Sequence, residues 1–432
     1  MTTRTLDRAG RGVRPALNGI RTTPVTVLDI GTTKIACFIA RPRPSHGFAL
    51  VGRGYQAAEG FKGGEVIDVD AAEASLAAAL HEAEEQAGDT VREVVIVTNA
   101  GKPVSRQVRV GQELGGATVR DEQLRALLVE ARATASDTEH EVLHTVPVSV
   151  YLDGGRPLKD PRGARGERLE MLATVVRARR QPLRDLITCL ERCHVRVTEI
   201  VAAPYAAGIA CLSEDEMERG CLVLDLGGGI SGFAHFADGR LLCLDQVPYG
   251  GLHVTGDLAF GLSTSRNYAE RLKTLHGGVV RRSCDADARI TFPLVGDRPE
   301  LPTGEVARAQ ITHIVRARVE EILDFVQEKI RANWEVFERR PPRSVVLTGG
   351  GSQLDGLEEL AEQVFGIPAR RGRPDLVHGR HGTENEPCCA ATCGALSLAS
   401  GDDDGLSWGD GREMPVLAGW LARLARWVEQ NF

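Results

Sequence analysis

Short apolar runs alternate along the chain with longer segments in which apolar residues recur at helical spacing, and this order predicts an α/β protein. Strands are expected over residues 34–39, 48–55, 94–98 and 195–200. Helices are expected over residues 71–86, 120–135, 182–193, 203–212, 254–275, 310–334 and 355–364. No apolar run approaches the roughly 20 residues that a membrane-spanning helix requires, and the N-terminus shows no apolar signal sequence.

Three of the strand-like runs end in glycine-rich turns. The first, Val27–Lys34, reads V-L-D-I-G-T-T-K, and the second, Leu222–Gly229, repeats its design as L-V-L-D-L-G-G-G. The third, Val345–Ser352, reads V-V-L-T-G-G-G-S. A single glycine turn after a strand often serves backbone geometry alone. Three in this order, with the first two built alike, indicate a nucleotide cleft between two lobes.

Glycines let the backbone approach a phosphate group closely, so that its N–H groups can point at the phosphate oxygens. Thr32 and Thr33 add hydroxyl donors, and Lys34 adds a positive charge. Asp29 and Asp225 end equivalent strands, so they are expected to face each other and to hold Mg²⁺ through its waters. The third turn is expected to open a helix whose N-terminus faces the adenosine and the α-phosphate. The residues predicted to bind the nucleotide from these turns are Asp29, Gly31, Thr32, Thr33, Lys34, Asp225, Gly227, Gly228, Gly229, Gly349, Gly350, Gly351 and Ser352.

Composition sets broad limits on the class of protein. The 432 residues suffice for two lobes or several subdomains, and 42% hydrophobic and 26% charged residues are ordinary for a globular protein. The net charge of −7 argues against a nucleic-acid partner. The ten cysteines are scattered without a His-containing zinc pattern, so they are expected to be reduced, mostly buried thiols of a cytosolic protein.

The two ends of the chain differ in composition from the rest. Residues 1–24 carry five arginines against Asp7 and are expected to be a disordered basic tail, either solvated or in contact with anionic lipid. Residues 398–413 are expected to form an acidic, flexible linker. The last segment, residues 414–432, is expected to be a separate helix.

The apolar residues of this last segment recur at spacings of three and four and form one stripe, with polar residues on the other face. Two tryptophans on the stripe, opposite two arginines, fit a helix that lies in a membrane interface. The alternative is a helix packed onto its own domain. The residues predicted to bind the membrane are Val416, Leu417, Trp420, Leu421, Arg423, Leu424, Arg426, Trp427, Val428 and Phe432.

Several stretches of the chain resemble the FtsA family of bacterial cell-division proteins, within the actin/Hsp70/sugar-kinase superfamily. They are residues 28–34, 144–147 (H-T-V-P), 227–229, 247–251 (V-P-Y-G-G) with 253–255, and 346–351. The resemblance runs from Val25 to Leu398 and resumes in the terminal helix. It implies an actin-like α/β fold of two lobes, each a ribonuclease-H-like domain. It also implies that Glu270 and Lys273 lie near the ribose and adenine, although by themselves these are two charges on a helix surface.

The same resemblance divides the chain into parts. The first lobe would consist of residues 25–103 and 181–220, interrupted by an FtsA-type subdomain inserted at 104–180. The second lobe would have its core in residues 221–253 and 336–397, the latter returning to the first lobe. Its outer subdomain would span residues 254–335.

The second glycine turn departs from the family's usual pattern, G-G-G-T-T-D. Here the turn continues as Gly229-Ile230-Ser231-Gly232, so a hydroxyl has become Ile230 and an acidic side chain has become Gly232. The acidic group would help to position metal or the attacking water. The hydroxyl would donate to phosphate, and the loss of both groups is expected to weaken hydrolysis more than binding, which predicts a nucleotide-binding switch with slow or absent turnover.

The resemblance implies a protein that binds ATP and Mg²⁺ and polymerises on the cytoplasmic face of the inner membrane. It would anchor FtsZ filaments there at the division septum and recruit later divisome membrane proteins. Its partners would be FtsZ, further copies of itself and anionic membrane lipid.

Other members of the superfamily supply the alternatives. A soluble small-molecule kinase would need a carboxylate base in its cleft and has no use for a lipid-binding helix. A type IV pilus assembly ATPase would share the inserted subdomain but is not expected to carry the Trp-rich terminal segment. An Hsp70-like chaperone would need a substrate-binding domain, for which the residues after the predicted ATPase core are too few.

Overall fold

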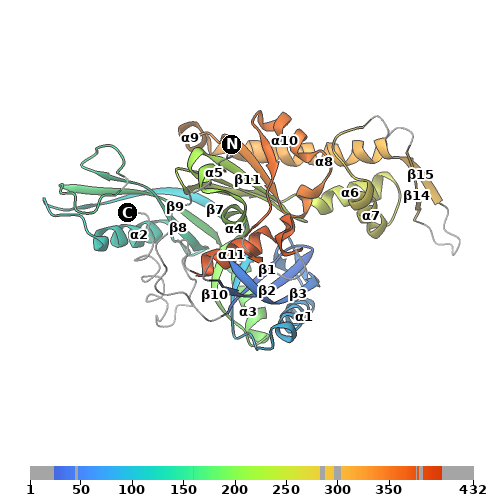
Figure 1. The fold of residues 1–432 in the computed structure, drawn as a ribbon, viewed down its shortest axis with the longest axis horizontal. Coiled ribbons are helices and arrows are strands. Elements are labelled where there is room, and N and C mark those ends of the chain that lie inside the picture. The colour runs from blue at the N-terminus through green and yellow to red at the C-terminus, as the bar shows by residue number, and fades with distance from the viewer. Residues whose placement is uncertain are drawn as a thin grey trace, which may run out of the picture.

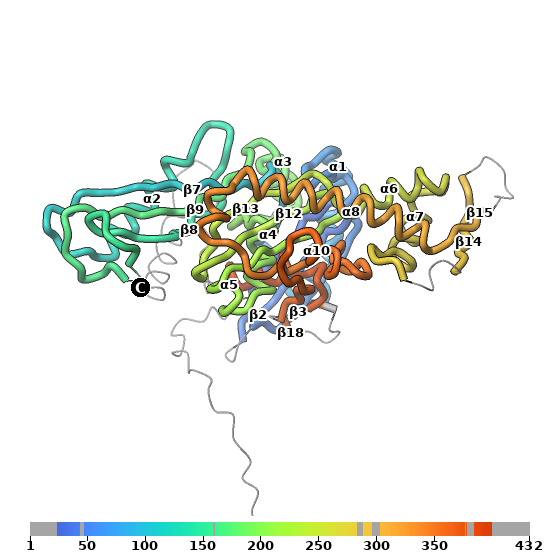
Figure 2. The backbone as a smooth tube through the Cα atoms, turned by 90° about the horizontal axis from the view of Figure 1, so that it is seen from above, coloured from blue at the N-terminus to red at the C-terminus, as the bar shows by residue number. Residues whose placement is uncertain are grey.

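The computed structural model of the chain describes residues 24–43, 47–158, 160–282, 288–295, 303–375, 377–378 and 383–400. The predicted basic tail, most of the predicted acidic linker and the predicted terminal helix lie outside these residues. The described residues form two sheet-based lobes at the centre of an elongated molecule, with a smaller subdomain towards each end (Figures 1 and 2). None of the helices in the described part is long and apolar enough to cross a bilayer.

The first lobe is built on a six-stranded sheet in the order β10-β6-β1-β2-β3-β18. Strand β1 pairs antiparallel with β2 and parallel with β6, and β6 pairs parallel with β10. Strand β6 is almost wholly buried, as its unbroken apolar run predicts. The strands are β1 (Val25–Ile30), β2 (Lys34–Pro42), β3 (Phe48–Ala57), β6 (Glu93–Thr98), β10 (Arg196–Ala202) and β18 (Val377–His378).

The second lobe repeats this plan in a five-stranded sheet of order β13-β12-β11-β16-β17. Here β11 pairs antiparallel with β12 and parallel with β16. The repetition places Asp29 opposite Ala36 in one hairpin and Asp225 opposite Gly232 in the other. The strands are β11 (Cys221–Leu226), β12 (Ser231–Ala237), β13 (Arg240–Val247), β16 (Ser344–Thr348) and β17 (Ala369–Arg371).

Two helices of small residues, α4 (Ala203–Cys211) and α11 (Ala390–Ser400), pack against each other between the two sheets (Figure 1). Helix α4 contacts β11 and β12, whereas α11 contacts β1 and β6. A Cβ added at Gly394 of α11 would lie 1.8 Å from the carbonyl oxygen of Ala206 in α4. The close crossing of these helices therefore depends on a residue without a side chain at position 394.

The other helices cover the outer faces of the sheets. Helix α1 (Val69–Ala87) begins at Asp68, whose carboxylate accepts a hydrogen bond from the Ala71 N–H, and ends at Gly88 in the left-handed conformation. The remaining helices of the lobes are α3 (Arg180–Arg192), α5 (Glu214–Arg219), α8 (Arg308–Ala332), α9 (Trp334–Arg339) and α10 (Leu357–Phe365). A small hairpin joins β4 (Phe61–Lys62) to β5 (Glu65–Val66).

At one end of the molecule, the chain between the first-lobe strands β6 and β10 forms a three-stranded antiparallel sheet in the order β7-β9-β8, covered by one helix. The elements are β7 (Val104–Glu113), α2 (Asp121–Ala135), β8 (His140–Leu152) and β9 (Arg168–Arg179). This subdomain has an apolar core of its own, including Leu124, Leu127 and Met171. It occupies the segment at which the family resemblance implies an inserted subdomain.

The opposite end carries the helices α6 (Gly251–Gly261) and α7 (Arg266–His276) with the hairpin β14 (Arg289–Pro293) and β15 (Thr303–Ala307). The sequence predicts one helix over residues 254–275, and this prediction is wrong in one respect. Ser263 adopts a positive φ of 50°, and the hydroxyl of Ser265 accepts the Tyr268 N–H as the cap of a new helix. Capping by Ser265 therefore divides the segment into two helices.

Candidate nucleotide site

The first two glycine turns have the same hydrogen-bonded geometry. The Gly31 N–H donates to the Lys34 carbonyl at 3.0 Å, and the Gly227 N–H donates to the Ile230 carbonyl, also at 3.0 Å. Each turn joins the first strand of its lobe to the antiparallel strand that follows it. The equivalence of the turns therefore pairs Lys34 of the first lobe with Ile230 of the second.

These two turns lie in contact across the space between the lobes. A Cβ added at Gly228 would lie 2.6 Å from Cγ2 of Thr33, and one added at Gly229 would lie 2.7 Å from Cγ2 of Thr32. The second turn therefore needs glycine at both positions, because the threonines of the first turn fill the space. The same approach leaves backbone N–H groups of both lobes around one cleft.

The third turn meets the second from the side of β16. Gly349 has a φ of 79°, and a Cβ there would lie 2.5 Å from Oδ1 of Asp225. The turn continues as a single 3-10 turn, η2 (Gly350–Gln353), and helix α10 begins only at Leu357. The expectation that this turn directly opens a helix is therefore wrong. The Ser352 hydroxyl is fully buried and donates to the Gly349 carbonyl at 2.7 Å, so it stabilises the turn itself.

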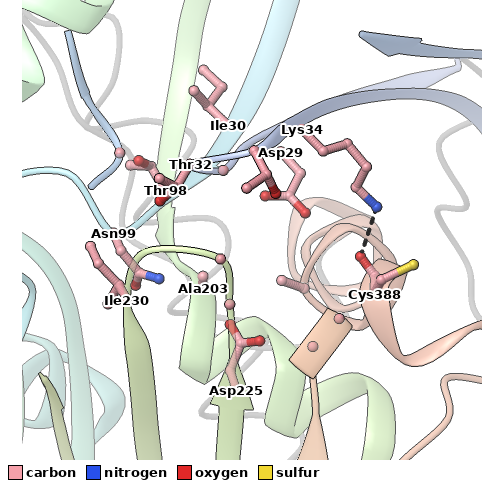
Figure 3. A pocket seen from close by; sticks show the side chains of 18 of the residues that line it. Asp29, Ile30, Thr32, Lys34, Thr98, Asn99, Ala203, Asp225, Ile230 and Cys388 are labelled. Atoms are coloured by element: carbon pink, nitrogen blue, oxygen red, sulfur yellow. Dashed lines mark hydrogen bonds between the residues drawn. The ribbon is translucent and has the colours of Figure 1, made fainter. Parts of the chain in front are cut away.

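The turns enclose a cleft of about 260 Å³ (Figure 3). Its walls include the predicted residues Asp29, Gly31, Thr32, Thr33, Lys34, Asp225, Gly227, Gly228, Gly349 and Gly350. Gly229, Gly351, Ser352, Glu270 and Lys273 are not among the lining residues. The cleft is also lined by residues that the sequence analysis did not identify, namely Ile30, Gly64, Thr98, Asn99, Ala203, Pro387, Cys388 and Ala391, together with Ile230.

One of these additions had a signal in the sequence, whereas another had none. Thr98 ends β6, which runs parallel to β1, so its end must lie beside that of β1 and near Asp29. Cys388 reaches the cleft on η4 (Pro387–Cys389), far along the chain from β1 and β2, and no local pattern predicts its position.

The two aspartates point into the cleft from opposite lobes (Figure 3). Asp29 Oδ2 accepts a hydrogen bond of 2.9 Å from the Thr392 hydroxyl of α11. Burial raises the pKa of the Asp29 carboxyl, although Lys34 and Thr392 oppose this shift. Burial, followed by the charge of Asp29, raises the pKa of Asp225 to about 7.

This pair of carboxylates fits a hydrated divalent cation. Each carboxylate is buried and repels the other, so a cation between them would favour the ionised form of both. The described residues contain no group of three or more His, Cys, Asp or Glu side chains placed to hold a metal. A cation at Asp29 and Asp225 would therefore complete its coordination with waters and ligand oxygens, as Mg²⁺ does beside phosphates.

Lys34, at the end of the first turn, contacts the short turn η4. Its ammonium donates to the carbonyl of Cys388 at 3.1 Å and lies 5.4 Å from the centroid of the Tyr55 ring. This arrangement places a positive charge at the wall of the cleft. Lys34 can therefore attract an anionic group while it holds η4 against the first lobe.

Glu270 and Lys273 lie on α7, one step removed from the cleft. The Lys273 ammonium contacts Glu270 Oε2 at 2.8 Å, Thr255 Oγ1 at 3.0 Å and the Gly251 carbonyl at 3.1 Å. The Gly251 N–H in turn donates to the Gly227 carbonyl of the second turn at 3.0 Å. The two charged residues thus belong to one network that supports this turn.

Position 232 has no room for a side chain. A Cβ added at Gly232 would lie 2.3 Å from Cγ of Pro204 in α4. Gly232, which replaces the acidic residue of the G-G-G-T-T-D pattern, therefore packs against Pro204, a residue that is distant in the sequence. Pro204 fills the place from which an acidic side chain would leave the backbone, and the neighbouring Ile230 presents an apolar group to the cleft.

Comparison with known proteins agrees with this geometry. The profile of the family described as "Cell division protein FtsA" matches residues 222–394, and that of the "SHS2 domain inserted in FTSA" matches residues 101–177. The chain is 35% identical to the cell division protein FtsA of Agrobacterium fabrum over 429 residues, with 96% of each chain covered.

Solved structures show the same fold at low sequence identity. A chain of a PilM-PilN type IV pilus biogenesis complex aligns with a TM-score of 0.61 and 18% identity, covering 88% of this chain and 99% of that one. MreB5 of Spiroplasma citri bound to ADP aligns with a TM-score of 0.54 and 11% identity, covering 87% of this chain and 96% of that one. The prediction of a two-lobed, actin-like α/β fold with an inserted FtsA-type subdomain is confirmed.

Proposed function

Because this chain belongs to the FtsA family of cell division proteins, we propose that it is an ATP-binding, actin-like protein that anchors FtsZ filaments to the membrane. It polymerises on the cytoplasmic face of the inner membrane, at the division septum, and recruits later divisome membrane proteins. The observation that carries the nucleotide part of this proposal is the contact of two matching glycine turns around Asp29 and Asp225.

The chain's own residues suit a nucleotide with several phosphates. The backbone of Gly31–Lys34 and of Gly227 and Gly228 would bind the phosphate oxygens, with Lys34 adding charge. Mg²⁺, held through waters by Asp29 and Asp225, would neutralise the charge of the phosphates. Because the two turns belong to different lobes, phosphates held by both would fix the angle between the lobes and favour contacts between protomers.

Slow hydrolysis follows from the wall of the cleft near the second turn. Asp29 and Asp225 are committed to the cation, and Gly232 with Pro204 excludes a further carboxylate from the position at which the family carries one. The small-molecule kinase is disfavoured for the same reason, since it needs a carboxylate base there. Steady-state ATP hydrolysis by the purified protein well above one turnover per minute, a rate of roughly 0.02 per second, would contradict this part of the proposal.

Replacing Gly232 with Asp is expected to destabilise the protein by about 1–3 kcal/mol without raising ATP hydrolysis, because the new Cβ meets Pro204. The double variant Gly232→Asp/Pro204→Ala removes this clash and is expected to recover stability and hydrolyse ATP faster than the parent. Melting temperature and phosphate release are measured for both, with Pro204→Ala alone as the control. A single variant as stable as the parent would show that Pro204 does not occupy this space.

The membrane part of the proposal rests on the amphipathic pattern of residues 414–432, which lie outside the described residues. Deleting everything after Glu413 is expected to abolish co-sedimentation with anionic liposomes, and ATP with Mg²⁺ is expected to increase pelleting of the full chain. Trp427→Glu, on the apolar stripe, should resemble the truncation, whereas Gln430→Glu, on the polar face, should pellet as the parent does. If all four proteins behave alike, the last segment is a packing element and the membrane role is lost.

Recruitment of FtsZ is tested in the same assay. FtsZ from the same organism is expected to pellet with anionic liposomes only when the full chain is present. Pelleting with the truncated chain would separate FtsZ binding from membrane binding, and no pelleting at all would contradict the anchoring role. The pilus-assembly alternative shares the fold, as the PilM-PilN comparison shows, but family membership favours cell division.

A further inference from the structure

The short turn η4 connects the two lobes beside the cleft. The carbonyl of Pro387 accepts hydrogen bonds from the Gly349 N–H and from the Thr348 hydroxyl of the second lobe, each at 3.1 Å. The next carbonyl, that of Cys388, accepts the ammonium of Lys34 from the first lobe at 3.1 Å. Two consecutive carbonyls of η4 thus accept hydrogen bonds from different lobes. The donors belong to the third and the first glycine turn of the candidate nucleotide site.

Two adjacent thiols occupy this turn. The sulfur atoms of Cys388 and Cys389 are 3.9 Å apart. Cys388 is half-buried and lines the cleft, whereas Cys389 is only 1% exposed and lies with its sulfur 3.6 Å from the Tyr55 hydroxyl. Cys388 is therefore the more exposed residue of the pair.

The surroundings favour a thiolate on the outer of the two sulfurs. The hydrogen bond between the two sulfurs and the charge of Lys34 lower the pKa of Cys388, although burial and the charge of Asp29 oppose this shift. The same hydrogen bond, followed by burial, raises the pKa of Cys389. A thiolate with a neighbouring protonated thiol is the arrangement of a reactive cysteine with its resolving partner.

We propose that Cys388 and Cys389 form a modification site for small peroxide oxidants, and that their oxidation weakens nucleotide binding. The Cys388 thiolate attacks one oxygen of hydrogen peroxide, which breaks the O–O bond and yields a sulfenic acid and hydroxide. The Cys389 thiol then attacks the sulfenic sulfur and forms the disulfide with release of water. Two thiols lose two electrons in total, and the peroxide gains them. The effect on binding rests on the nucleotide-binding function proposed above.

Closing this disulfide must distort η4. The sulfur atoms must approach from 3.9 Å to a bond of about 2.05 Å. Neighbouring Cα atoms are about 3.8 Å apart across a trans peptide, below the range of about 4.4–6.8 Å that disulfides usually span. The bond is therefore strained and readily reduced, so the modification is reversible. The distortion falls on the carbonyls that Gly349 and Lys34 hold, which couples it to the phosphate turns.

Other cysteines of the chain provide controls for this reactivity. Cys193 at the end of α3 is the second half-buried cysteine in the described part of the chain, and its sulfur lies 3.8 Å from the Glu73 carbonyl oxygen. Burial raises its pKa to about 11. Cys393, on the same segment as the pair, is fully buried with its sulfur 3.3 Å from the Glu384 carbonyl oxygen. Cys193 is half-buried like Cys388 but has a raised pKa, so it serves as the internal standard for the rate of oxidation.

The test treats the reduced full chain with hydrogen peroxide without nucleotide and follows each cysteine peptide by mass spectrometry. The peptide that contains Cys388 and Cys389 is expected to lose the mass of two hydrogens roughly tenfold faster than Cys193 is oxidised. A thiol reductant should restore the original mass. The loss should persist in Cys393→Ser and disappear in Cys388→Ser. In Cys389→Ser, a sulfenic acid on Cys388 should be trapped by dimedone. Oxidation of the pair no faster than that of Cys193, or loss of the disulfide in Cys393→Ser, would overturn the site.

The effect on binding is measured separately, with a fluorescent ATP analogue and Mg²⁺. The oxidised protein is expected to bind roughly tenfold more weakly than the reduced protein, the loss expected when one hydrogen bond to a charged group is removed. Addition of reductant should recover the affinity. Equal affinity before and after oxidation would overturn the coupling. If the reduced protein binds no nucleotide, the proposed function and the coupling both fail, while the mass spectra still decide whether the thiol pair is a modification site.

Discussion

Asp225→Asn is expected to weaken Mg²⁺-dependent ATP binding roughly 10–100-fold, as loss of a group that holds a metal through water does, and to stabilise the nucleotide-free protein at pH 8. Burial and the charge of Asp29 raise the pKa of Asp225 from 3.8 to about 7 in the folded protein. Between these values the folded state keeps a proton that the unfolded chain has lost. The free energy of unfolding therefore falls as the pH rises from about 4 to about 7, and the loss persists above pH 7.

An asparagine at this position has no charge to bury, so it removes the pH-dependent penalty. The variant is expected to be more stable than the parent by on the order of 2 kcal/mol at pH 8 and by little at pH 4. Thermal unfolding at both pH values and titration with an ATP analogue, with and without Mg²⁺, measure the two effects. Asp215→Asn, at an exposed carboxylate of α5, is the matched control and should change neither. Unchanged binding by Asp225→Asn would remove Asp225 from the proposed cation site.

Gly394→Ala is expected to lower the stability of the protein by about 3 kcal/mol or more, because one added methyl group separates α4 from α11. The new Cβ would lie 1.8 Å from the Ala206 carbonyl oxygen, a contact with backbone that no rotation of a side chain can relieve. The gain of up to about 1 kcal/mol in helix propensity on replacing glycine with alanine is too small to offset this clash. Since the two helices lie between the sheets, their separation also moves the lobes and widens the cleft.

The matched control is Gly256→Ala in α6, where an added Cβ would have no neighbour within 4 Å. This variant is expected to be as stable as the parent or more stable by about 0.5–1 kcal/mol. Melting temperature reports the difference, and limited proteolysis reports opening of the lobes. A Gly394→Ala protein that melts with the parent would show that the helices can part without loss of packing.

The long helices and the positions of the glycine turns could be predicted from the sequence, since their signals are local. A glycine-rich turn after an apolar strand depends on the conformations of a few neighbouring residues, and Gly31 and Gly227 each begin a hydrogen-bonded turn at the predicted place. Helical periodicity placed α1, α2 and α8 near their observed bounds, because burial of one face needs apolar residues at fixed intervals. Ser265 lies within a continuous periodic segment and gives no break in the pattern, so the sequence predicts one helix where the structure has two.

Only the tertiary structure decided what surrounds the turns. Thr392 reaches Asp29, Cys388 reaches Lys34, and Pro204 fills the space at Gly232, and each of these contacts joins residues that are far apart in the chain. Such contacts depend on how two sheets and the helices between them pack, which no short sequence window records. The repeated D-x-G turns by themselves predicted two similar lobes, each with a glycine turn after its first strand. The packing of α4 and α11 determined how closely these lobes approach, because interlocking side chains and missing Cβ atoms set that distance.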